Sequence, residues 1–271
     1  MRIALGISYS GTAYQGWQSQ PNGMTLQDHL EHALARFMDC DERVITLCAG
    51  RTDTGVHALN QVVHFDTELI RDESSWIRGT NRYLPPDIAV QWCCYVPQAF
   101  HARNAAIGRR YIYVVLESMV RPALELHRVG WSWRPLNEDA MKQAASFLLG
   151  EHDFSAFRSS QCQSPTPVKT LRRLNIRHNG QYWLFEFEAN AFLHHMVRNL
   201  IGSLLAVGSG VQSPQWMFEV LESRKREHAA PTFSPDGLYF IGPEYETHWQ
   251  IPHNEAALDG IPGYLRELYY D

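Results

Sequence analysis

The sequence has none of the long segments that mark disorder, secretion or a membrane span. Its 271 residues contain no long block rich in Pro, Gly and Ser and no long run of one charge, so the chain is expected to be ordered nearly throughout. No run approaches the ~18 consecutive apolar residues that a membrane-spanning helix requires. Residues 1–8 alternate like a strand and do not resemble a secretory signal. We therefore expect a cytoplasmic protein.

The sequence also has few cysteines and no excess of positive charge. The five cysteines are odd in number and irregularly spaced, which argues against a disulfide framework and favours reduced thiols. The net charge of -5 argues mildly against nucleic acid as a partner, because Lys and Arg drive phosphate binding. Basic residues nevertheless gather at 103–110 and 169–177. This distribution is compatible with an acidic protein that has a basic groove.

Hydrophobic periodicity indicates strands and helices in both halves of the chain. Strands are predicted at residues 2–8, 44–48, 61–65, 88–96, 110–116, 170–177 and 182–189, and helices at 26–37, 74–83, 138–149 and 193–207. The second half resembles the first in element order, and hairpin-type neighbours favour a mainly antiparallel sheet. We predict an α+β fold with two halves, residues 1–104 and 105–245, followed by a C-terminal extension over residues 246–271.

Asp53 is the strongest candidate for a reacting group. It lies in residues 50–57 (GRTDTGVH), between two predicted strands. An Asp flanked by Gly and Thr is also an ordinary turn residue. Its neighbours Arg51 and His57 favour a functional role, and the glycines allow backbone to approach a ligand closely. A guanidinium nearby favours the charged carboxylate, which is the form that a nucleophile requires.

The same residues permit a protease interpretation, because Asp-Thr-Gly is the signature of aspartic proteases. Such an enzyme needs two carboxylates that share one proton. The chain has no second Asp-Thr-Gly or Asp-Ser-Gly, so protease chemistry would require a symmetric dimer. Arg51 would also oppose proton sharing. The residues alone leave Asp53 open between a nucleophile, a protease acid and a structural turn.

The order of motifs along the chain resembles the bacterial tRNA pseudouridine synthases of the TruA family. Each motif is weak alone, but their joint order and spacing make a coincidence improbable. They are residues 9–11 (YSG), 16–18 (GWQ), 50–57 (GRTDTGVH), 61–65 (QVVHF), 100–103 (FHAR), 109–113 (RRYIY), 150–154 (GEHDF), 190–199 (NAFLHHMVRN) and 237–239 (GLY).

This resemblance implies a fold, a reaction and a partner. The fold would have two similar α/β-sandwich halves that share a mainly antiparallel sheet, with helices on one side. The reaction would be isomerisation of uridine to pseudouridine at positions 38, 39 and 40 in the anticodon stem-loop of tRNA. The family works as a homodimer, and this redox-neutral isomerisation requires neither cofactor nor metal.

The resemblance also assigns roles to single residues. Asp53 matches the catalytic aspartate, and Arg51 matches the arginine that assists base flipping. Tyr111 matches the tyrosine that stacks on the target base, Arg198 the basic partner of the catalytic carboxylate, and Leu238 a substrate-binding position. The positions that match RNA-contacting stretches are Arg71, Phe100, His101, Ala102, Arg103, Asn104, Gln161, Cys162, Gln163, Ser164 and Pro165.

Some positions depart from the family pattern or carry an alternative. Met119 stands where the family has a basic RNA contact, and residues 224–234 and those after Tyr245 align poorly. His194 and His195 invite a metal interpretation, but no neighbouring acid or cysteine spacing supports one, so we predict core or RNA-backbone roles. A non-catalytic RNA-binding protein on the same fold would keep the groove residues without needing Asp53.

Overall fold

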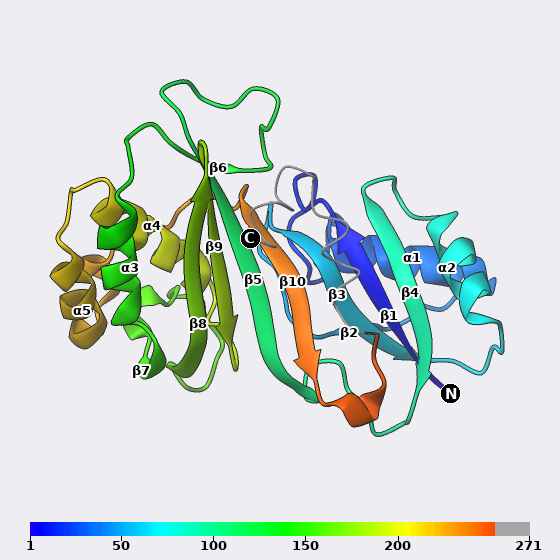
Figure 1. The fold of residues 1–271 in the computed structure, drawn as a ribbon. Coiled ribbons are helices and arrows are strands. Elements are labelled where there is room, and N and C mark those ends of the chain that lie inside the picture. Colours follow the sequence, from blue (N-terminus) through cyan, green and yellow to red (C-terminus); the bar gives the residue numbers. More distant parts are fainter. Residues whose placement is uncertain (253–271) are drawn as a thin grey trace. The chain divides into compact units, whose positions relative to one another are not determined.

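The computed structural model describes residues 1–252, and the chain forms two compact units. Among the described residues, the first unit comprises Met1–Ile107 and residues 239–252, and the second comprises Gly108–Leu238. Each unit combines a sheet with helices (Figure 1). Most of the predicted extension, from residue 253 to residue 271, lies outside the described residues.

The sheet of the first unit is built around the N-terminal strand. Its order is β4 (Ile88–Val96), β1 (Arg2–Tyr9), β3 (His57–Asp66) and β10 (Leu238–Tyr245), with the short β2 (Leu47–Cys48) also paired to β3. Strand β1 is antiparallel to both neighbours. Strand β10 runs parallel to β3, with Tyr239 opposite His57. Because β3 and β10 both begin beside the Asp53 segment, the sheet fixes the position of that segment.

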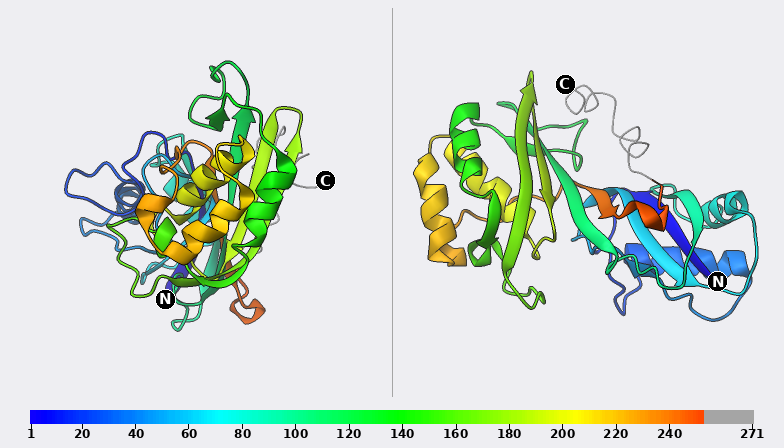
Figure 2. Two further views of the ribbon diagram at one scale, coloured as in Figure 1. Left: turned by 90° about the vertical axis from the view of Figure 1, so that its left-hand side faces the viewer. Right: turned by 60° about the horizontal axis from the view of Figure 1, so that its bottom comes forward.

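Helices α1 (Leu26–Met38) and α2 (Glu73–Asn81) cover one face of this sheet (Figure 2). Thr25 caps α1, because its side chain accepts a hydrogen bond from the Asp28 N–H. Trp76 of α2 is fully buried, and its ring contacts Phe37 of α1 and Phe65 of β3 edge-on. These aromatic contacts join both helices to the sheet.

The opposite face of the same sheet is covered by irregular chain. Ala4 and Val62 share a buried cluster with Phe100, Ala102 and Ile251. The segment after β4 and the segment after β10 therefore form the second covering layer. This explains why β1 is buried almost continuously, although its sequence alternates.

The second unit also combines strands with helices. The sheet order is β5 (Ala106–Glu117), β9 (Tyr182–Ala189), β8 (Val168–Asn179) and β7 (Gly150–Asp153), with β6 (Gly130–Ser132) parallel to β5. The helices are α3 (Glu138–Ser146), α4 (Met196–Gly208) and α5 (Pro214–Ser223). Strand β9 is buried along most of its length, and Trp183, Phe185, Phe187 and Ala189 on one of its faces are all buried.

The prediction of an α+β fold with mainly antiparallel strands is confirmed, and the element bounds need correction. Strands β3 and β5 are longer than predicted and β2 is shorter. Helix α4 begins at Met196 and not at Leu193, because His195 has a left-handed φ of 63° that a helix cannot contain. The periodicity analysis missed β7, α5 and β10, although Ser213 followed by Pro214 is an N-cap and first-turn signal.

Candidate active site

Asp53 sits at the start of a tight turn in the first unit. Its carbonyl accepts a hydrogen bond from the Val56 N–H at 3.1 Å, and Gly55 has a φ of 82°. A positive φ at the third position is what a type II turn demands, and glycine adopts it without strain. The Asp53 side chain is half-buried, so it is partly shielded yet reachable.

Two glycines let neighbouring backbone pack directly against this turn. A Cβ at Gly16 would lie 2.9 Å from the Thr52 carbonyl oxygen and 3.2 Å from the Thr54 nitrogen. A Cβ at Gly11 would lie 2.0 Å from the Val56 carbonyl oxygen. The glycines of the YSG and GWQ motifs therefore serve the Asp53 turn, and this is the physical reason for motifs so far apart in the sequence.

Hydrogen bonds hold both ends of the turn. Before Asp53, the Thr52 hydroxyl lies 2.7 Å from the Tyr9 hydroxyl, and the Thr52 carbonyl accepts from the Trp17 N–H at 3.0 Å. After it, His57 Nδ1 accepts from the Gly11 N–H at 3.2 Å. The His57 ring also stacks on Tyr239, with ring centroids 4.7 Å apart. His57 is thus a structural residue of the loop.

Arg51 and Arg103 lie near the same thiol. Both guanidiniums act on Cys48, where burial raises the thiol pKa to about 11 and the two arginines oppose that rise. Both arginine side chains are exposed. The first unit therefore brings Arg51 of the Asp53 segment and Arg103 of the 100–104 segment to one surface, which is the arrangement that a phosphate backbone would favour.

Segment 100–104 is divided between core and surface. Phe100 and Ala102 have no exposed area, and the Phe100 and Ala102 carbonyls accept hydrogen bonds from Arg2 and Tyr245. Both side chains pack inside the first unit, so only the backbone of these two residues is available to RNA, and their RNA-binding roles stay predictions. Arg103 and Asn104 are exposed, and His101 Nδ1 accepts from the Arg103 N–H at 3.2 Å.

Arg71 lies on a separate surface of the first unit, just before α2. Its side chain is exposed, and its backbone carbonyl accepts a hydrogen bond from the Tyr95 hydroxyl. Arg71 lines an open hollow together with Asp72, Glu73 and Tyr95. The adjoining acids weaken its attraction for phosphate, so its role as an RNA contact stays a prediction.

Tyr111 lies on β5 in the second unit and is 9% exposed. Its ring meets Phe192 edge-on at a centroid distance of 5.0 Å. Side chains alternate along a strand, so Arg110 points to the opposite face, where it pairs with Glu186 at 3.0 Å. Only Arg109 shares the face of Tyr111.

Arg198 and Leu238 also belong to the second unit. Arg198, in the first turn of α4, donates its Nε–H to the Phe233 carbonyl at 2.9 Å. Leu238 is 5% exposed and follows Gly237, where a Cβ would lie 2.2 Å from the Val114 carbonyl oxygen. These contacts fix both residues within their unit, and their predicted roles toward substrate stay predictions.

Residues 161–165 form a loop whose backbone is held by Arg158. Its guanidinium donates to the carbonyls of Cys162 and Ser164 at 2.7 and 2.9 Å. Burial raises the pKa of the Cys162 thiol, but the N–H groups of Ser164 and His194 together with Arg158 outweigh it and lower the pKa. Gln161, Gln163 and Pro165 are exposed, so they are accessible for contact with RNA.

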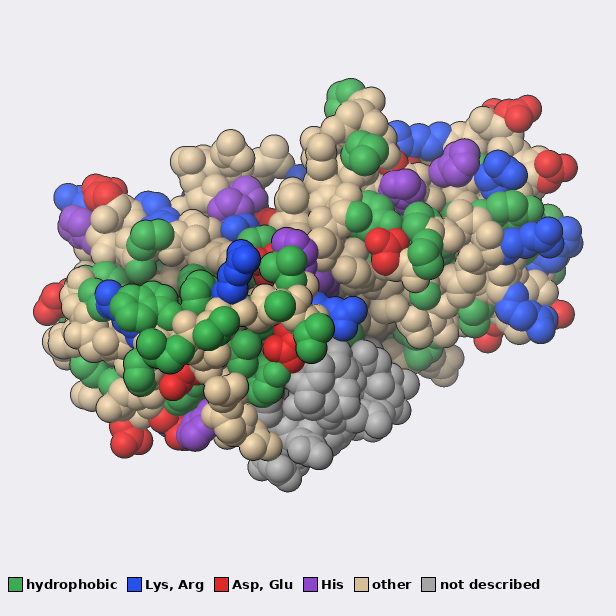
Figure 3. Space-filling model, turned by 90° about the horizontal axis from the view of Figure 1, so that it is seen from above, with side chains coloured by type: hydrophobic (Ala, Val, Ile, Leu, Met, Phe, Trp, Pro, Cys, Tyr) green, Lys and Arg blue, Asp and Glu red, His purple; other side chains and the backbone are tan. Residues whose placement is uncertain are grey.

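The surface charge is mixed. On the face drawn in Figure 3, Lys and Arg side chains are interspersed with acidic and apolar ones. This agrees with the net charge of -5, and it means that individual arginines, not one uniform basic face, would bind an RNA backbone. In residues 1–252 none of the helices has the length and apolar character to cross a membrane.

The sequence relatives of this chain identify its family. Residues 6–103 and 144–246 match the model of the tRNA pseudouridine synthase family. The tRNA pseudouridine synthase A of Methylibium petroleiphilum is 64% identical over 97% of this chain and 100% of its own length. That of Polaromonas naphthalenivorans is 62% identical with the same coverage. The chain therefore belongs to the tRNA pseudouridine synthase family, whose reaction converts uridine in tRNA to pseudouridine.

A solved structure described as a Cbf5-Nop10-Gar1 complex also matches, at a TM-score of 0.39 and 13% identity. The match covers 97% of this chain and 58% of that chain. A likeness of this size supports no conclusion about the site. The family assignment rests on the close sequence relatives.

Proposed function

We propose that this protein isomerises uridine to pseudouridine at positions 38, 39 and 40 in the anticodon stem-loop of tRNA, as a cytoplasmic homodimer with Asp53 as nucleophile. The observation that carries the proposal is the Asp53 turn. Thr52, directly before Asp53, is held by Tyr9 through its hydroxyl and by Trp17 through its carbonyl, and the Val56 N–H closes the turn onto the Asp53 carbonyl. The Asp53 residue itself stays partly exposed. Such rigidity around one accessible carboxylate is typical of a reacting group and is more than a surface turn requires.

The reaction explains why a carboxylate suffices. The bond from ribose C1' to N1 of uracil breaks, the base rotates, and a new bond forms from C1' to C5, which then loses its proton. Electrons balance within the substrate, so the overall change is redox-neutral. An ionised Asp53 can form a covalent adduct at C6 of the base or at C1' of the ribose. Both routes need the carboxylate in its charged form.

Base extrusion is the role that we propose for Arg51. Enzymes that act on a base remove it from the stack, and a side chain then fills the gap. Arg51 is exposed and only two residues before Asp53, so a flipped base and its vacated position would both be close to the turn. Arg103, on the same surface, would bind the adjoining phosphates.

Tyr111, Leu238 and Arg198 are the residues of the second unit to which we assign roles toward the target base. Tyr111 offers an aromatic ring already oriented by Phe192, and stacking on a base contributes about 1–3 kcal/mol. Leu238 would add apolar contact. Arg198 would counter the tendency of burial to neutralise Asp53. The exposed residues of loop 161–165 and Arg71 would contact more distant parts of the tRNA.

The direct test is to map pseudouridine in three anticodon stem-loops, each with a single uridine at position 38, 39 or 40. Chemical tagging of pseudouridine in all three after incubation with the protein is the expected result. Tight binding without conversion would favour a non-catalytic RNA-binding protein. Peptide cleavage at acidic pH would favour the protease interpretation. Sedimentation equilibrium tests the homodimer separately, and a monomer at working concentrations would contradict it.

A further inference from the structure

A short strap connects helix α1 to the Asp53 turn. The strap consists of residues 16–19, and its first two carbonyls accept hydrogen bonds from the start of α1. The Leu26 N–H donates to the Gly16 carbonyl at 3.2 Å, and the Gln27 N–H donates to the Trp17 carbonyl at 3.1 Å. The first N–H groups of a helix have no partner within it, so here they are used to hold the strap.

The strap in turn holds the residue before Asp53. The Trp17 N–H donates to the Thr52 carbonyl, and Gly16 packs against the Thr52 and Thr54 backbone. Trp17 is 1% exposed, so its ring anchors the strap in the core. A displacement of the strap must therefore move the turn that carries Asp53.

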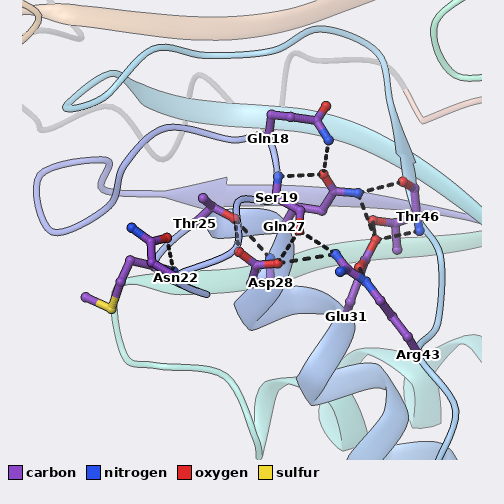
Figure 4. A network of polar contacts seen from close by, with 10 residues as sticks. Gln18, Ser19, Asn22, Thr25, Gln27, Asp28, Glu31, Arg43 and Thr46 are labelled. Carbon is purple, nitrogen blue, oxygen red and sulfur yellow. Dashed lines mark hydrogen bonds and ion pairs between the residues drawn. The ribbon is translucent and has the colours of Figure 1, made fainter.

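A buried carboxylate on α1 organises the other side of the strap (Figure 4). The Glu31 side chain is 3% exposed, and its Oε2 accepts from Arg43 Nε at 2.5 Å. Its Oε1 accepts from the Thr46 N–H at 2.8 Å, the Thr46 hydroxyl at 2.9 Å and Gln27 Nε2 at 2.8 Å. Every contact of Glu31 in this network has the carboxylate as acceptor.

Gln27 and Asp28 connect Glu31 and Arg43 to the strap by hydrogen bonds. With its amide nitrogen bound to Glu31, Gln27 presents Oε1 to the Ser19 N–H at 3.0 Å and to Gln18 Nε2 at 3.1 Å. Asp28 accepts from the Ser19 hydroxyl at 2.5 Å. Arg43 closes the network, because its NH2 donates to the same hydroxyl at 2.7 Å.

The direction of these hydrogen bonds, from donor to acceptor, depends on the charge of Glu31. A carboxylate orients the Gln27 amide with its oxygen toward the strap, which needs an acceptor for the Ser19 N–H. A neutral amide at position 31 would be able to donate, and it would be a weaker acceptor for Arg43 and Thr46. Gln27 Nε2 also donates to the Thr46 carbonyl at 3.1 Å, so the charge on Glu31 and that carbonyl together favour this orientation of Gln27 and this position of the strap.

We propose that Glu31, paired with Arg43, is a positioning residue for catalysis, which holds the Asp53 turn in its reactive position through Gln27 and the strap. The inference rests on the proposed function, since it requires Asp53 to be the reacting group. Glu31 does not touch the turn itself. Loss of its charge should reduce the rate of the chemical step and leave tRNA affinity nearly unchanged.

The experiment measures single-turnover conversion of an anticodon stem-loop at saturating enzyme, together with the stem-loop dissociation constant. The variants are Glu31→Gln and Ser19→Ala, compared with Glu138→Gln. Glu138 is a matched control, because it is a helical Glu in an ion pair with Lys142 at 2.7 Å that has no link to the strap. Rates are normalised to folded enzyme, well below each variant's melting temperature.

We expect Glu31→Gln to lower the single-turnover rate constant about 10- to 100-fold, because small displacements of a reacting group have effects of this size. Its dissociation constant should stay within about twofold of the wild type, and Glu138→Gln should match the wild type in both. A purely structural Glu31 would lower the melting temperature but leave the normalised rate unchanged, and that result would overturn the proposal.

Two further variants cover the remaining outcomes. If Glu31→Gln does not fold, Ser19→Ala tests the proposal instead, because it removes one hydroxyl at the strap and retains the buried ion pair. A single-turnover rate below that of the wild type supports the proposal, and an unchanged rate overturns it. Asp53→Asn separates the two proposals. If Asp53→Asn stays active, both the proposed function and the positioning role of Glu31 are wrong. If Asp53→Asn is inactive and Glu31→Gln is fully active, only the positioning role is wrong.

Discussion

The hydroxyl oxygens of Tyr9 and Thr52 lie 2.7 Å apart in a buried contact. Tyr9 is the last residue of β1, and Thr52 directly precedes Asp53, so one hydrogen bond ties the end of the central strand to the proposed nucleophile. The strap reaches the same residue from the other direction, through the Thr52 carbonyl. Thr52 is thus the point at which two independent supports of the Asp53 turn meet.

Tyr9→Phe should destabilise the protein by about 1–2 kcal/mol, because the buried Thr52 hydroxyl loses its partner. The rate of pseudouridine formation should fall as well, since the turn loses one support. Urea unfolding and single-turnover kinetics measure the two effects. Tyr83→Phe is the control, because that ring is 37% exposed at the protein surface. Equal behaviour of the two variants would remove the role given to the Tyr9 hydroxyl.

Gly16→Ala tests the close approach of the strap. Gly16 has a φ of 80°, and an added Cβ would lie 2.9 Å from the Thr52 carbonyl oxygen. Gly23→Ala is a matched control, because Gly23 has a φ of 67° but open space around the added Cβ. We expect Gly16→Ala to be the more destabilising by about 1–3 kcal/mol, the range typical of overpacking. Chemical denaturation of both variants measures the difference, and similar losses would mean that backbone strain alone matters at Gly16.

Much of this site could be anticipated from the sequence, and the reasons for the failures are physical. Asp53, Arg51 and the glycine motifs were found because they lie in short, distinctive segments. Tyr9 and Thr52 were not singled out, because a hydroxyl pair separated by 43 positions leaves no local pattern. Phe100 and Ala102 were predicted as RNA contacts because they lie in a stretch that matches RNA-contacting residues of the family. Their burial depends on packing against Ala4, Val62 and Ile251, which are distant in the sequence.

The strands also differ in how well the sequence predicts them. Strands β4 and β9 were predicted with the bounds that the structure has, because their alternation is strong. Strand β10 was missed, since its burial depends on pairing with β3, far away in the sequence. Long-range pairing of this kind is invisible to a window of neighbouring residues.

His64 should remain neutral at pH 5. Burial lowers its pKa to about 4, and Arg2 and His101 add to this effect. Its Nδ1 accepts from the Ala102 N–H at 3.1 Å, so a proton there would break the contact that supports segment 100–104. Between about pH 4 and the ordinary His pKa of 6.5, the unfolded chain binds more protons, so this residue makes stability rise with pH. An NMR titration of the ring tests this, and a midpoint near 6.5 would contradict it.

Arg103→Ala should weaken tRNA binding without slowing chemistry at saturation. The guanidinium is exposed on the surface that Arg51 shares, and we assign it to phosphate. Loss of one phosphate contact should reduce the slope of log affinity against log salt by about 1. Arg78→Ala, at another exposed arginine of the first unit, is the control. A lower single-turnover rate at saturating enzyme would instead place Arg103 among the groups that shape the reaction.

The central claim is that the Asp53 carboxylate reacts, and Asp53→Asn tests it most directly because it changes charge with almost no change in shape. The measurement is single-turnover formation of pseudouridine at positions 38, 39 and 40 of an anticodon stem-loop. We predict a loss of about 10⁴-fold or more, as for removal of other nucleophiles, with tRNA binding and the unfolding transition retained. Conversion by the folded Asp53→Asn protein at near the wild-type rate would contradict the account.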